Sequence, residues 1–184
     1  MQNNNTRRKL VHALLKLMET NSYKTITVKE ITFKAGLSRR TFYTYFESTY
    51  AVLQECFRIK TRELSEKIFA IENLSVESFL NCYIGYFYEN RKILKIVLND
   101  EAISPKLFFD RFFSSVEELL KDLIPERYNL YNRTLHSFVS GGAQRIITEW
   151  VNSDCRTSTR EISETIGIFL SAAYKTEEPL QASS

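Results

Sequence analysis

Apolar residues recur at intervals of three and four along most of the chain, which is the period of an amphipathic α-helix. Leu10, Leu14 and Leu17 illustrate the pattern, because they fall on one face of a helix predicted over 6–21. Glycine and proline are scarce, with 5 and 3 copies, so long stretches contain nothing that interrupts a helix. The pattern therefore predicts an all-α fold of about nine helices.

Cap-forming residues mark where the later helices begin. Thr27 and Glu30 have the spacing of a capping box, in which each side chain binds the backbone amide of the other residue. N-caps for four more helices are expected from Ser38, Ser48, Ser75 and Ser158, and Pro105 suits the first turn of another. The predicted ranges after the first helix are 28–35, 39–45, 49–71, 76–88, 91–98, 105–123, 130–151 and 159–174.

The segment 27–46, TVKEITFKAGLSRRTFYTYF, contains two short predicted helices separated by a turn. Gly36 stands in that turn, where a left-handed backbone is wanted, and the small side chain of Ala35 lets the two helices approach closely. A compact apolar interior is expected from Val28, Ile31, Ala35, Leu37, Phe42 and Phe46. This arrangement is a helix-turn-helix, a motif whose second helix enters the major groove of DNA.

The second helix of this motif has an unusual outward surface. Its outward positions are Arg39, Arg40, Thr41, Tyr43, Thr44 and Tyr45, and none of them is acidic. Arginine can bind guanine O6 and N7 with two donors, threonine can contact a thymine methyl, and hydroxyls can reach phosphate oxygens. Arg39 and Arg40 stand at the N-terminal end, the part of a recognition helix that contacts base edges. The alternative is an aromatic-rich core helix with two solvated arginines, but its aromatic and threonine positions are too many to point inward together.

Charge is distributed unevenly along the chain. Residues 1–62 contain 12 Lys and Arg against 4 Asp and Glu, whereas residues 63–184 contain 13 against 18, so the overall charge of +3 conceals a basic front and an acidic remainder. A basic segment on an acidic body indicates that the segment meets a polyanion. We therefore expect a DNA-binding domain over 1–50 and a second helical domain over 51–184.

These residues resemble a known family. An initial helix, then TVKEI, AGLS and TFYTYF, then a capped long helix, is similar to the DNA-binding domain of TetR-family regulators over residues 7–53. The resemblance implies that Arg39, Arg40 and Tyr43 face bases or nearby phosphates, and that Thr27, Lys29, Thr41 and Tyr45 contact the DNA backbone.

One position departs from the pattern of the family. Members often have a lysine near the start of the fourth helix as a phosphate contact, and Thr49 occupies that position here. Threonine can hydrogen-bond a phosphate without adding charge. The resemblance therefore implies a shallower salt dependence from this site, with Arg7 or Arg8 contributing instead.

Residues 51–184 resemble the family's domain for effector binding and dimerisation. Aromatic residues are dense at 79–88 and 108–113, which indicates either ordinary core packing or a cavity for a small, partly apolar effector. The resemblance favours a cavity, since family members commonly bind an inducer between these helices. Its candidate lining is Tyr83, Phe87, Phe109, Phe112 and Phe138, with His136 and Gln144 as polar partners.

Gly141 and Gly142 lie inside a predicted helix, where each glycine costs up to about 1 kcal/mol relative to alanine. Close packing against another helix would offset that cost. The resemblance implies that the last two helices form an intermolecular four-helix bundle; the alternative is a helix pair within one chain. The expected seam residues are Phe138, Gly142, Ile146, Trp150, Ile162, Ile166, Phe169 and Ala173. A homodimer would bind the two half-sites of a palindromic double-stranded operator.

The expected function is a cytoplasmic DNA-binding transcriptional regulator, a repressor whose operator affinity a small-molecule effector modulates. The alternative is a DNA-bound adaptor or activator whose C-terminal domain binds a protein partner. An enzyme is not expected, because the sequence shows no Ser-His-Asp set, no phosphate-cradling glycine loop and no metal-ligand cluster. Cys56, Cys82 and Cys155 form no CxxC pair and are interpreted as ordinary thiols, with a redox sensor as the alternative. No cofactor, metal or membrane span is expected.

Overall fold

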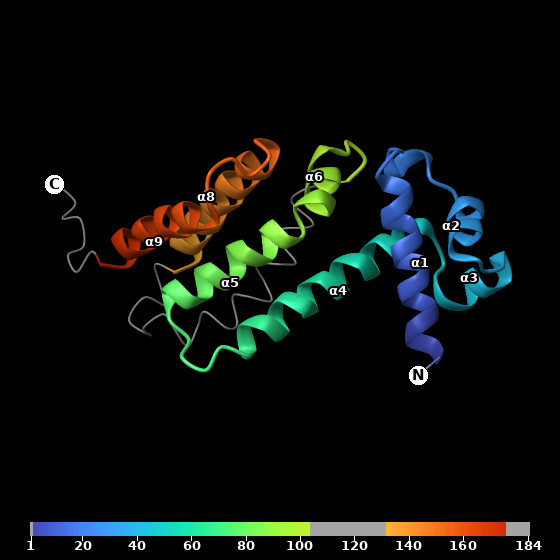
Figure 1. Cartoon of the computed structure of the whole chain (residues 1–184), viewed down its shortest axis with the longest axis horizontal. Helices are drawn as coiled ribbons and strands as arrows, with labels where there is room; N and C mark the ends of the chain where they lie inside the picture. Colours follow the sequence, from blue (N-terminus) through green and yellow to red (C-terminus); the bar gives the residue numbers. More distant parts are fainter. Residues whose placement is uncertain (1, 104–131, 176–184) are drawn as a thin grey trace. The chain divides into compact units, whose positions relative to one another are not determined.

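The computed structural model describes residues 2–103 and 132–175, and within these ranges every regular element is helical (Figure 1). The all-α class predicted from the sequence is therefore confirmed. The helix predicted over 105–123 lies outside the described residues. None of the described helices combines the length and the apolar character that a membrane crossing requires.

The elements follow the predicted order closely. The first helix begins at Gln2 and not at Thr6, and it ends at Met18 and not at Asn21, because the carbonyl of Leu17 accepts the amides of both Thr20 and Asn21 and closes the helix in a turn. The fourth ends at Phe69, where the i→i−3 bond from Ile71 tightens the chain. The bounds are α1 Gln2–Met18, η1 Tyr23–Thr25, α2 Val28–Ala35, α3 Arg39–Tyr45, α4 Thr49–Phe69, α5 Val76–Glu89, α6 Arg91–Asn99, α8 Asn132–Asn152 and α9 Thr159–Lys175.

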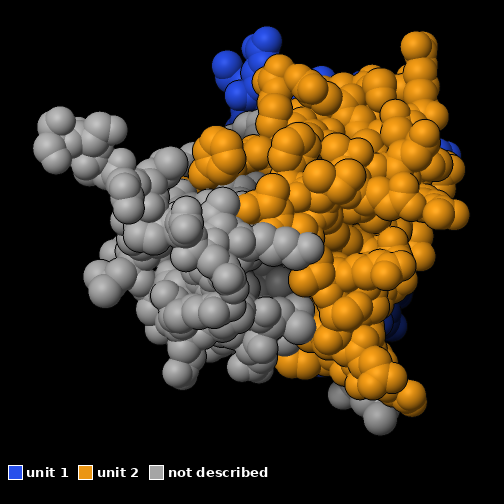
Figure 2. Space-filling model, turned by 90° about the vertical axis from the view of Figure 1, so that its left-hand side faces the viewer, with its two compact units in different colours: residues 1–64, 92–112 blue, residues 65–91, 113–184 orange. Residues whose placement is uncertain are grey.

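Packing divides the chain into two compact units. Unit 1 contains residues 1–64 and 92–112, and unit 2 contains residues 65–91 and 113–184 (Figure 2). The domain boundary predicted at residue 50 falls inside unit 1, at the start of α4.

The core of unit 1 forms where α1 packs on α2 and α2 packs on α3. Leu10 and Leu14 on α1, Ile31 on α2 and Phe42 on α3 are all fully buried. Burying side chains of this size stabilises a fold by roughly 1.5–3 kcal/mol each. The apolar face of α1 thus packs together with buried residues of the helix-turn-helix in one cluster. This cluster fixes the inner face of α3.

The turn between α2 and α3 depends on Gly36. This residue has φ of +65°, in the left-handed region that side-chain-bearing residues avoid. Its amide donates to the carbonyl of Phe33, and the next amide, of Leu37, donates to the carbonyl of Thr32 at 2.9 Å. These paired bonds are a Schellman motif, which ends α2 abruptly and sets the direction in which α3 begins.

Unit 2 is built on the packing of α5 against α9, with α8 also against α9. Gly167 on α9 faces the Leu80 side chain of α5, and a Cβ at this position would be in ordinary van der Waals contact with it at 3.4 Å. Beside this contact the Ser163 hydroxyl donates to the Leu80 carbonyl at 3.4 Å. Leu80 therefore contacts α9 through both its side chain and its backbone.

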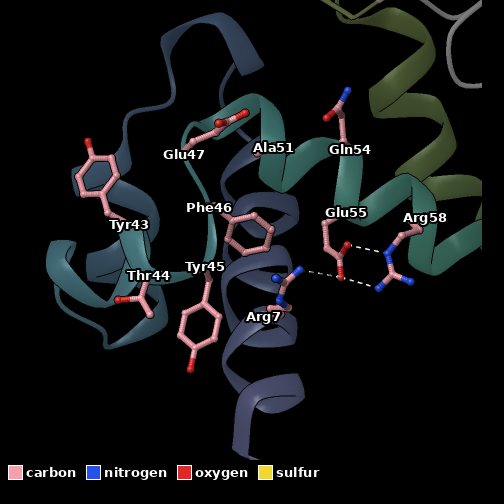
Figure 3. A pocket seen from close by; sticks show the side chains of 10 residues that line it. All are labelled: Arg7, Tyr43, Thr44, Tyr45, Phe46, Glu47, Ala51, Gln54, Glu55 and Arg58. Carbon is pink, nitrogen blue, oxygen red and sulfur yellow. Dashed lines mark hydrogen bonds and ion pairs between the residues drawn. The ribbon is translucent and has the colours of Figure 1, made fainter.

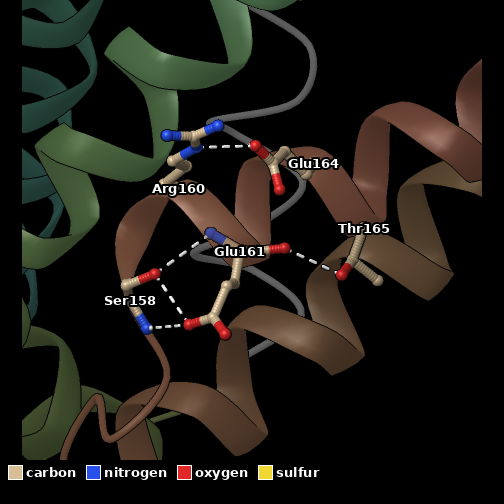
Figure 4. A network of polar contacts seen from close by, with 5 residues as sticks. All are labelled: Ser158, Arg160, Glu161, Glu164 and Thr165. Atoms are coloured by element: carbon tan, nitrogen blue, oxygen red, sulfur yellow. Dashed lines mark hydrogen bonds and ion pairs between the residues drawn. The ribbon is translucent and has the colours of Figure 1, made fainter.

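The start of α9 is held by the Ser158 cap that the sequence predicts. Ser158 and Glu161 form a reciprocal pair, in which the Glu161 amide donates to the Ser158 hydroxyl and the Glu161 carboxylate accepts from the Ser158 amide and hydroxyl (Figure 4). One turn on, Arg160 donates to Glu164 at 2.7 Å. The bonds between Ser158 and Glu161 give partners to the backbone amides of both residues, as in a capping box.

The turn from α8 to α9 is organised around Trp150. Its indole N–H donates to the Thr157 carbonyl at 2.7 Å, and its backbone carbonyl accepts from the Cys155 amide at 2.9 Å. The indole also stacks on the Tyr88 ring of α5, with centroids 6.1 Å apart. Trp150 thereby connects α5, α8 and the turn before α9.

Candidate nucleic-acid interface

The second helix of the helix-turn-helix, α3, is anchored by two aromatic residues. Phe42 is fully buried, Phe46 is 5% exposed, and their ring centroids lie 6.1 Å apart. Ser38 caps the helix by accepting from the Thr41 amide at 3.0 Å, as predicted. With its inner face held and its N-terminus capped, α3 presents its other residues from a fixed backbone.

The residues predicted to face outward on α3 are exposed or half-buried, and none of them is acidic. The side chains of Arg39, Arg40, Tyr43 and Thr44 are exposed, and those of Thr41 and Tyr45 are half-buried. We call the four exposed residues the α3 face. Among the described residues neither guanidinium forms an ion pair, and the first turn contains no acid.

Two arginines at a helix N-terminus oppose the helix dipole, which favours negative charge there. Stability therefore does not account for Arg39 and Arg40, whereas a polyanionic partner does. The exposed donors and hydroxyls of the α3 face are groups that bind base edges and phosphates. The arrangement is suited to insertion into the major groove of a duplex.

At the start of α2, Thr27 forms the predicted capping box with Glu30. The Thr27 hydroxyl donates to the Glu30 carboxylate at 2.7 Å, and that carboxylate also accepts the Thr27 amide at 2.8 Å. These two bonds hold the pKa of Glu30 below its ordinary value. Thr27 and Lys29 are both exposed, and the hydroxyl proton of Thr27 is already committed to the cap.

The start of α4 combines a cap with a contact to a distant segment. Ser48 accepts from the Ala51 amide at 3.1 Å, which confirms it as the N-cap. The hydroxyl of Thr49 is half-buried and lies 3.4 Å from the phenol oxygen of Tyr23. Thr49, predicted as a phosphate contact, therefore also has a partner inside unit 1.

A hollow of about 460 Å³ opens in unit 1 where the C-terminal end of α3 meets α1 and α4 (Figure 3). On its wall the Arg7 guanidinium lies 5.5 Å from the centroid of the Phe46 ring and 4.0 Å from the Glu55 carboxylate. Arg58 donates to the same carboxylate. Glu55 was not predicted as a notable residue, because no local sequence pattern distinguishes a buried acid on α4 from a solvated one.

The residues predicted to line an effector cavity have different environments. Tyr83 and Phe87 are buried on α5, with ring centroids 4.7 Å apart, and burial raises the pKa of the Tyr83 phenol. Phe138 on α8 is 78% exposed. Phe109 and Phe112 lie outside the described residues, as does the side chain of His136, and Gln144 is half-buried.

The residues predicted for the dimer seam fall into two groups. Trp150, Ile162 and Ile166 are buried within their own chain, which fits the alternative of an intramolecular helix pair at those positions. Phe138 and Phe169 are 78% and 61% exposed. Gly142 is exposed, Ile146 is half-buried, and the side chain of Ala173 lies outside the described residues. Ile168, 68% exposed, adds to the apolar surface of α9. A seam between two chains would therefore involve the exposed group.

Comparison with known families identifies both parts of the chain. Residues 10–56 match the family described as bacterial regulatory proteins, tetR family. Residues 75–172, more than half of the chain, match the family described as transcriptional regulator C-terminal region. The first match covers the whole helix-turn-helix, and the second covers α5, α6, α8 and most of α9.

Among individual proteins, the chain is 24% identical over 170 residues to the uncharacterized HTH-type transcriptional regulator YxbF of Bacillus subtilis (strain 168). That match covers 84% of this chain and 42% of YxbF, so the chain spans less than half the length of this relative.

Two solved structures share the fold. The dihydroxyacetone kinase operon activator DhaS superposes with a TM-score of 0.67 and 19% identity, covering 92% of this chain and 96% of DhaS. The transcriptional regulator FadR from Bacillus subtilis, in complex with stearoyl-CoA, superposes with a TM-score of 0.66 and 17% identity, covering 91% of this chain and 97% of FadR.

Proposed function

Because the chain belongs to the TetR family of DNA-binding transcriptional regulators, we propose that it is a repressor that binds a palindromic operator as a homodimer. The observation that carries the proposal is the α3 face, which exposes two arginines and two hydroxyl side chains on a capped helix whose own sequence contains no acid. Such a helix contacts only a few base pairs, so two copies at a fixed spacing supply the specificity that one lacks. An operator-bound protein of this kind acts in the cytoplasm, where bacterial DNA lies.

Arg39 and Arg40 are proposed to bind base edges, with Tyr43 and Thr44 beside them and Thr41 and Tyr45 on the phosphates. Thr27, Lys29 and Thr49 are proposed to contact the backbone from the starts of α2 and α4. A lost bidentate arginine contact costs roughly 1–3 kcal/mol of discrimination between bases. The two arginines together therefore account for most of the sequence preference that one α3 supplies.

Dimerisation is proposed to use the exposed apolar residues of α8 and α9. Phe138 and Phe169 are large, apolar and open to solvent in the single chain, and Gly142, one turn after Phe138 on α8, is exposed and would let a second helix approach closely. Covering apolar area is worth about 25 cal/mol per Å², which favours burial of these side chains against a partner copy.

The proposed effector is a small, largely apolar molecule that contacts α5 near Tyr83 and Phe87. The aromatic cluster of this helix and the stearoyl-CoA complex of FadR support an effector with a long apolar group. Binding would lower operator affinity by favouring a protein conformation in which the two α3 helices fit the half-sites less well.

One observation favours a second candidate, a DNA-bound activator whose unit 2 binds a protein partner. A hollow of about 960 Å³ lies between α5 and α9, lined by Val76, Leu80 and Ile168 among others, and DhaS is an operon activator. Thermal unfolding against a panel of acyl-CoAs and metabolites separates the two candidates. An effector present at 100 times its Kd stabilises the protein by about 2.7 kcal/mol, whereas a protein-binding activator responds to none of the compounds.

The DNA-binding proposal is tested by selecting duplexes from a random pool with the wild-type protein and measuring Kd by fluorescence anisotropy at several salt concentrations. The test variant is Arg39→Ala/Arg40→Ala. The matched control is Arg156→Ala/Arg160→Ala, which removes the same charge from exposed positions in unit 2. We expect the test variant to lose sequence-specific binding and the control to keep it. Equal weakening of both variants would mean that binding is non-specific attraction, which contradicts the assignment of the α3 face.

A further inference from the structure

The carboxylate of Asp100 bridges two segments of unit 1 that lie far apart in the sequence. Asp100 directly follows α6, and both of its carboxylate oxygens accept from the Ser22 hydroxyl at 3.2 Å. One of them also accepts the backbone amide of Tyr23. On its own side the carboxylate accepts the Ala102 amide at 2.9 Å. Three donors from two segments therefore converge on one carboxylate.

This contact supplies a cap that the local sequence lacks. Tyr23 is the first residue of the 3-10 helix η1, and the amides of a first helical turn have no partner within the helix. Ser22 stands at the N-cap position, but its side chain makes no capping bond to η1. Asp100 takes over that function from α6, and its negative charge suits the positive end of the helix.

From η1 the contact continues to the start of α4. The phenol oxygen of Tyr23 lies 3.4 Å from the Thr49 hydroxyl, so Tyr23 is held by its backbone at Asp100 and by its side chain at Thr49. Thr49 begins α4 three residues after Phe46, which anchors the end of α3. The position of Thr49 thus affects both a proposed phosphate contact and the C-terminal end of the α3 helix.

We propose that Asp100 is a positioning residue for DNA binding, which holds Tyr23 so that Thr49 and the end of α3 keep the geometry that fits the duplex. Asp100 contacts no DNA in this proposal and acts only through Tyr23 and Thr49. The inference rests on the α3 face proposed above as the DNA-binding surface.

The test compares four variants of the full chain on the duplex selected by the wild-type protein. Asp100→Asn keeps the size of the side chain and removes the charge that accepts three bonds. Tyr23→Phe removes only the phenol oxygen, and the double variant combines the two changes. Glu101→Gln is the matched control, because it removes the same charge from the neighbouring exposed residue. Thermal unfolding establishes that each variant is folded at the assay temperature.

We expect Asp100→Asn to weaken operator binding by about 5- to 20-fold relative to Glu101→Gln, because only part of the energy of the charged hydrogen bonds at Asp100 is coupled to DNA binding through Tyr23 and Thr49. Tyr23→Phe is expected to weaken operator binding by about 3- to 10-fold. The double variant should bind within about twofold of Asp100→Asn, because both changes interrupt the same chain of contacts from Asp100 through Tyr23 to Thr49. The slope of log Kd against log salt stays that of the wild type, since Thr49 is uncharged and no lysine or arginine contact to a phosphate is removed.

Equal affinity of Asp100→Asn and Glu101→Gln would overturn the inference while leaving the proposed function intact. If the losses of binding free energy in the two single variants add up in the double variant, Asp100 does not act through Tyr23. A salt slope that differs from that of the wild type would mean that the Asp100 charge acts on the DNA directly. If Asp100→Asn is unfolded, Tyr23→Phe decides, since it keeps the ring and the backbone contact. Failure of the wild-type protein to bind any duplex would instead refute the proposed function, and the inference with it.

Discussion

The guanidinium of Arg58 donates to both carboxylate oxygens of Glu55, with the Nε–Oε2 and Nη2–Oε1 distances both 2.7 Å. The Glu55 side chain is only 8% exposed, and its other nearby cation, Arg7, lies 4.0 Å away. A carboxylate with so little access to water depends on its protein partners. The pair therefore differs from the exposed ion pairs elsewhere on the described helices.

Arg58→Ala should destabilise the protein by about 1–2 kcal/mol, because it leaves a buried carboxylate with one distant partner. Arg160→Ala serves as the control, since it breaks a bond of the same length to Glu164, whose side chain is 57% exposed. Exposed pairs of this kind contribute about 0–1 kcal/mol. Urea unfolding followed by circular dichroism measures both, and equal losses would show that the burial of Glu55 has no energetic consequence.

Acid should weaken the protein through the same carboxylate. The hydrogen bond from Arg58 holds the pKa of Glu55 below the ordinary value of 4.5, although burial opposes this shift. A glutamate with a lowered folded-state pKa stabilises the fold fully above its unfolded-state pKa and loses that contribution as pH falls through the folded value. The free energy of unfolding should thus fall below about pH 4.5, and fall less in Glu55→Gln. Identical acid limbs for the two proteins, in urea titrations from pH 3 to pH 7, would contradict the assignment.

Gly36→Ala should destabilise the protein by about 1–2 kcal/mol, since its φ of +65° is costly for any residue with a Cβ. Gly85→Ala is the opposite case: Gly85 lies inside α5 with open space around it, so alanine should stabilise the helix by up to about 1 kcal/mol. Thermal unfolding of the two variants should shift in opposite directions. A similar loss at both positions would mean that packing, and not backbone conformation, decides the cost.

The proposed dimer seam predicts a specific change of mass. Phe138→Lys/Phe169→Lys places two charges on the exposed apolar surface of α8 and α9 and should give a monomer by sedimentation velocity. Phe33→Lys is the control, because Phe33 is 89% exposed on α2, which belongs to unit 1 and contributes no residue to the proposed seam. A dimer that persists in the double variant would show that the seam lies elsewhere.

The three cysteines should react at different rates. Cys56 is 1% exposed, and burial raises the pKa of its thiol to about 12, so at pH 8 it is neutral and inaccessible. Cys82 and Cys155 are half-buried. We expect a thiol reagent to modify Cys56 only after denaturant is added, as quantified against Cys56→Ser. Rapid labelling of all three in the folded protein would favour the redox-sensor alternative.

Local features of the structure were predictable from the sequence because their determinants lie within a few residues. Thr27 with Glu30, Ser38 with Thr41, and the left-handed Gly36 each involve neighbours on one turn. The outward arginines of α3 follow from helical period alone once Phe42 is inside. Sequence patterns of this kind set where helices begin, end and face solvent.

Contacts between distant segments were not predictable, because they depend on how the helices pack. Asp100 and Tyr23 are 77 residues apart, and neither has a pattern that points to the other. Glu55 has the same spacing to Arg58 whether it is solvated or buried. The family resemblance implied an intermolecular seam at Trp150, and the helical spacing of this residue is equally compatible with the stack on Tyr88 observed within unit 2.

Trp150 has a spectroscopic consequence, because it is the single tryptophan of the chain. It is 3% exposed and its emission reports the packing of unit 2 alone, while unit 1 contributes only tyrosine signal. Unfolding followed at the tryptophan emission maximum therefore measures one unit, and far-ultraviolet circular dichroism measures both. A protein in which the two curves separate can be assigned two independent stabilities without introducing any label.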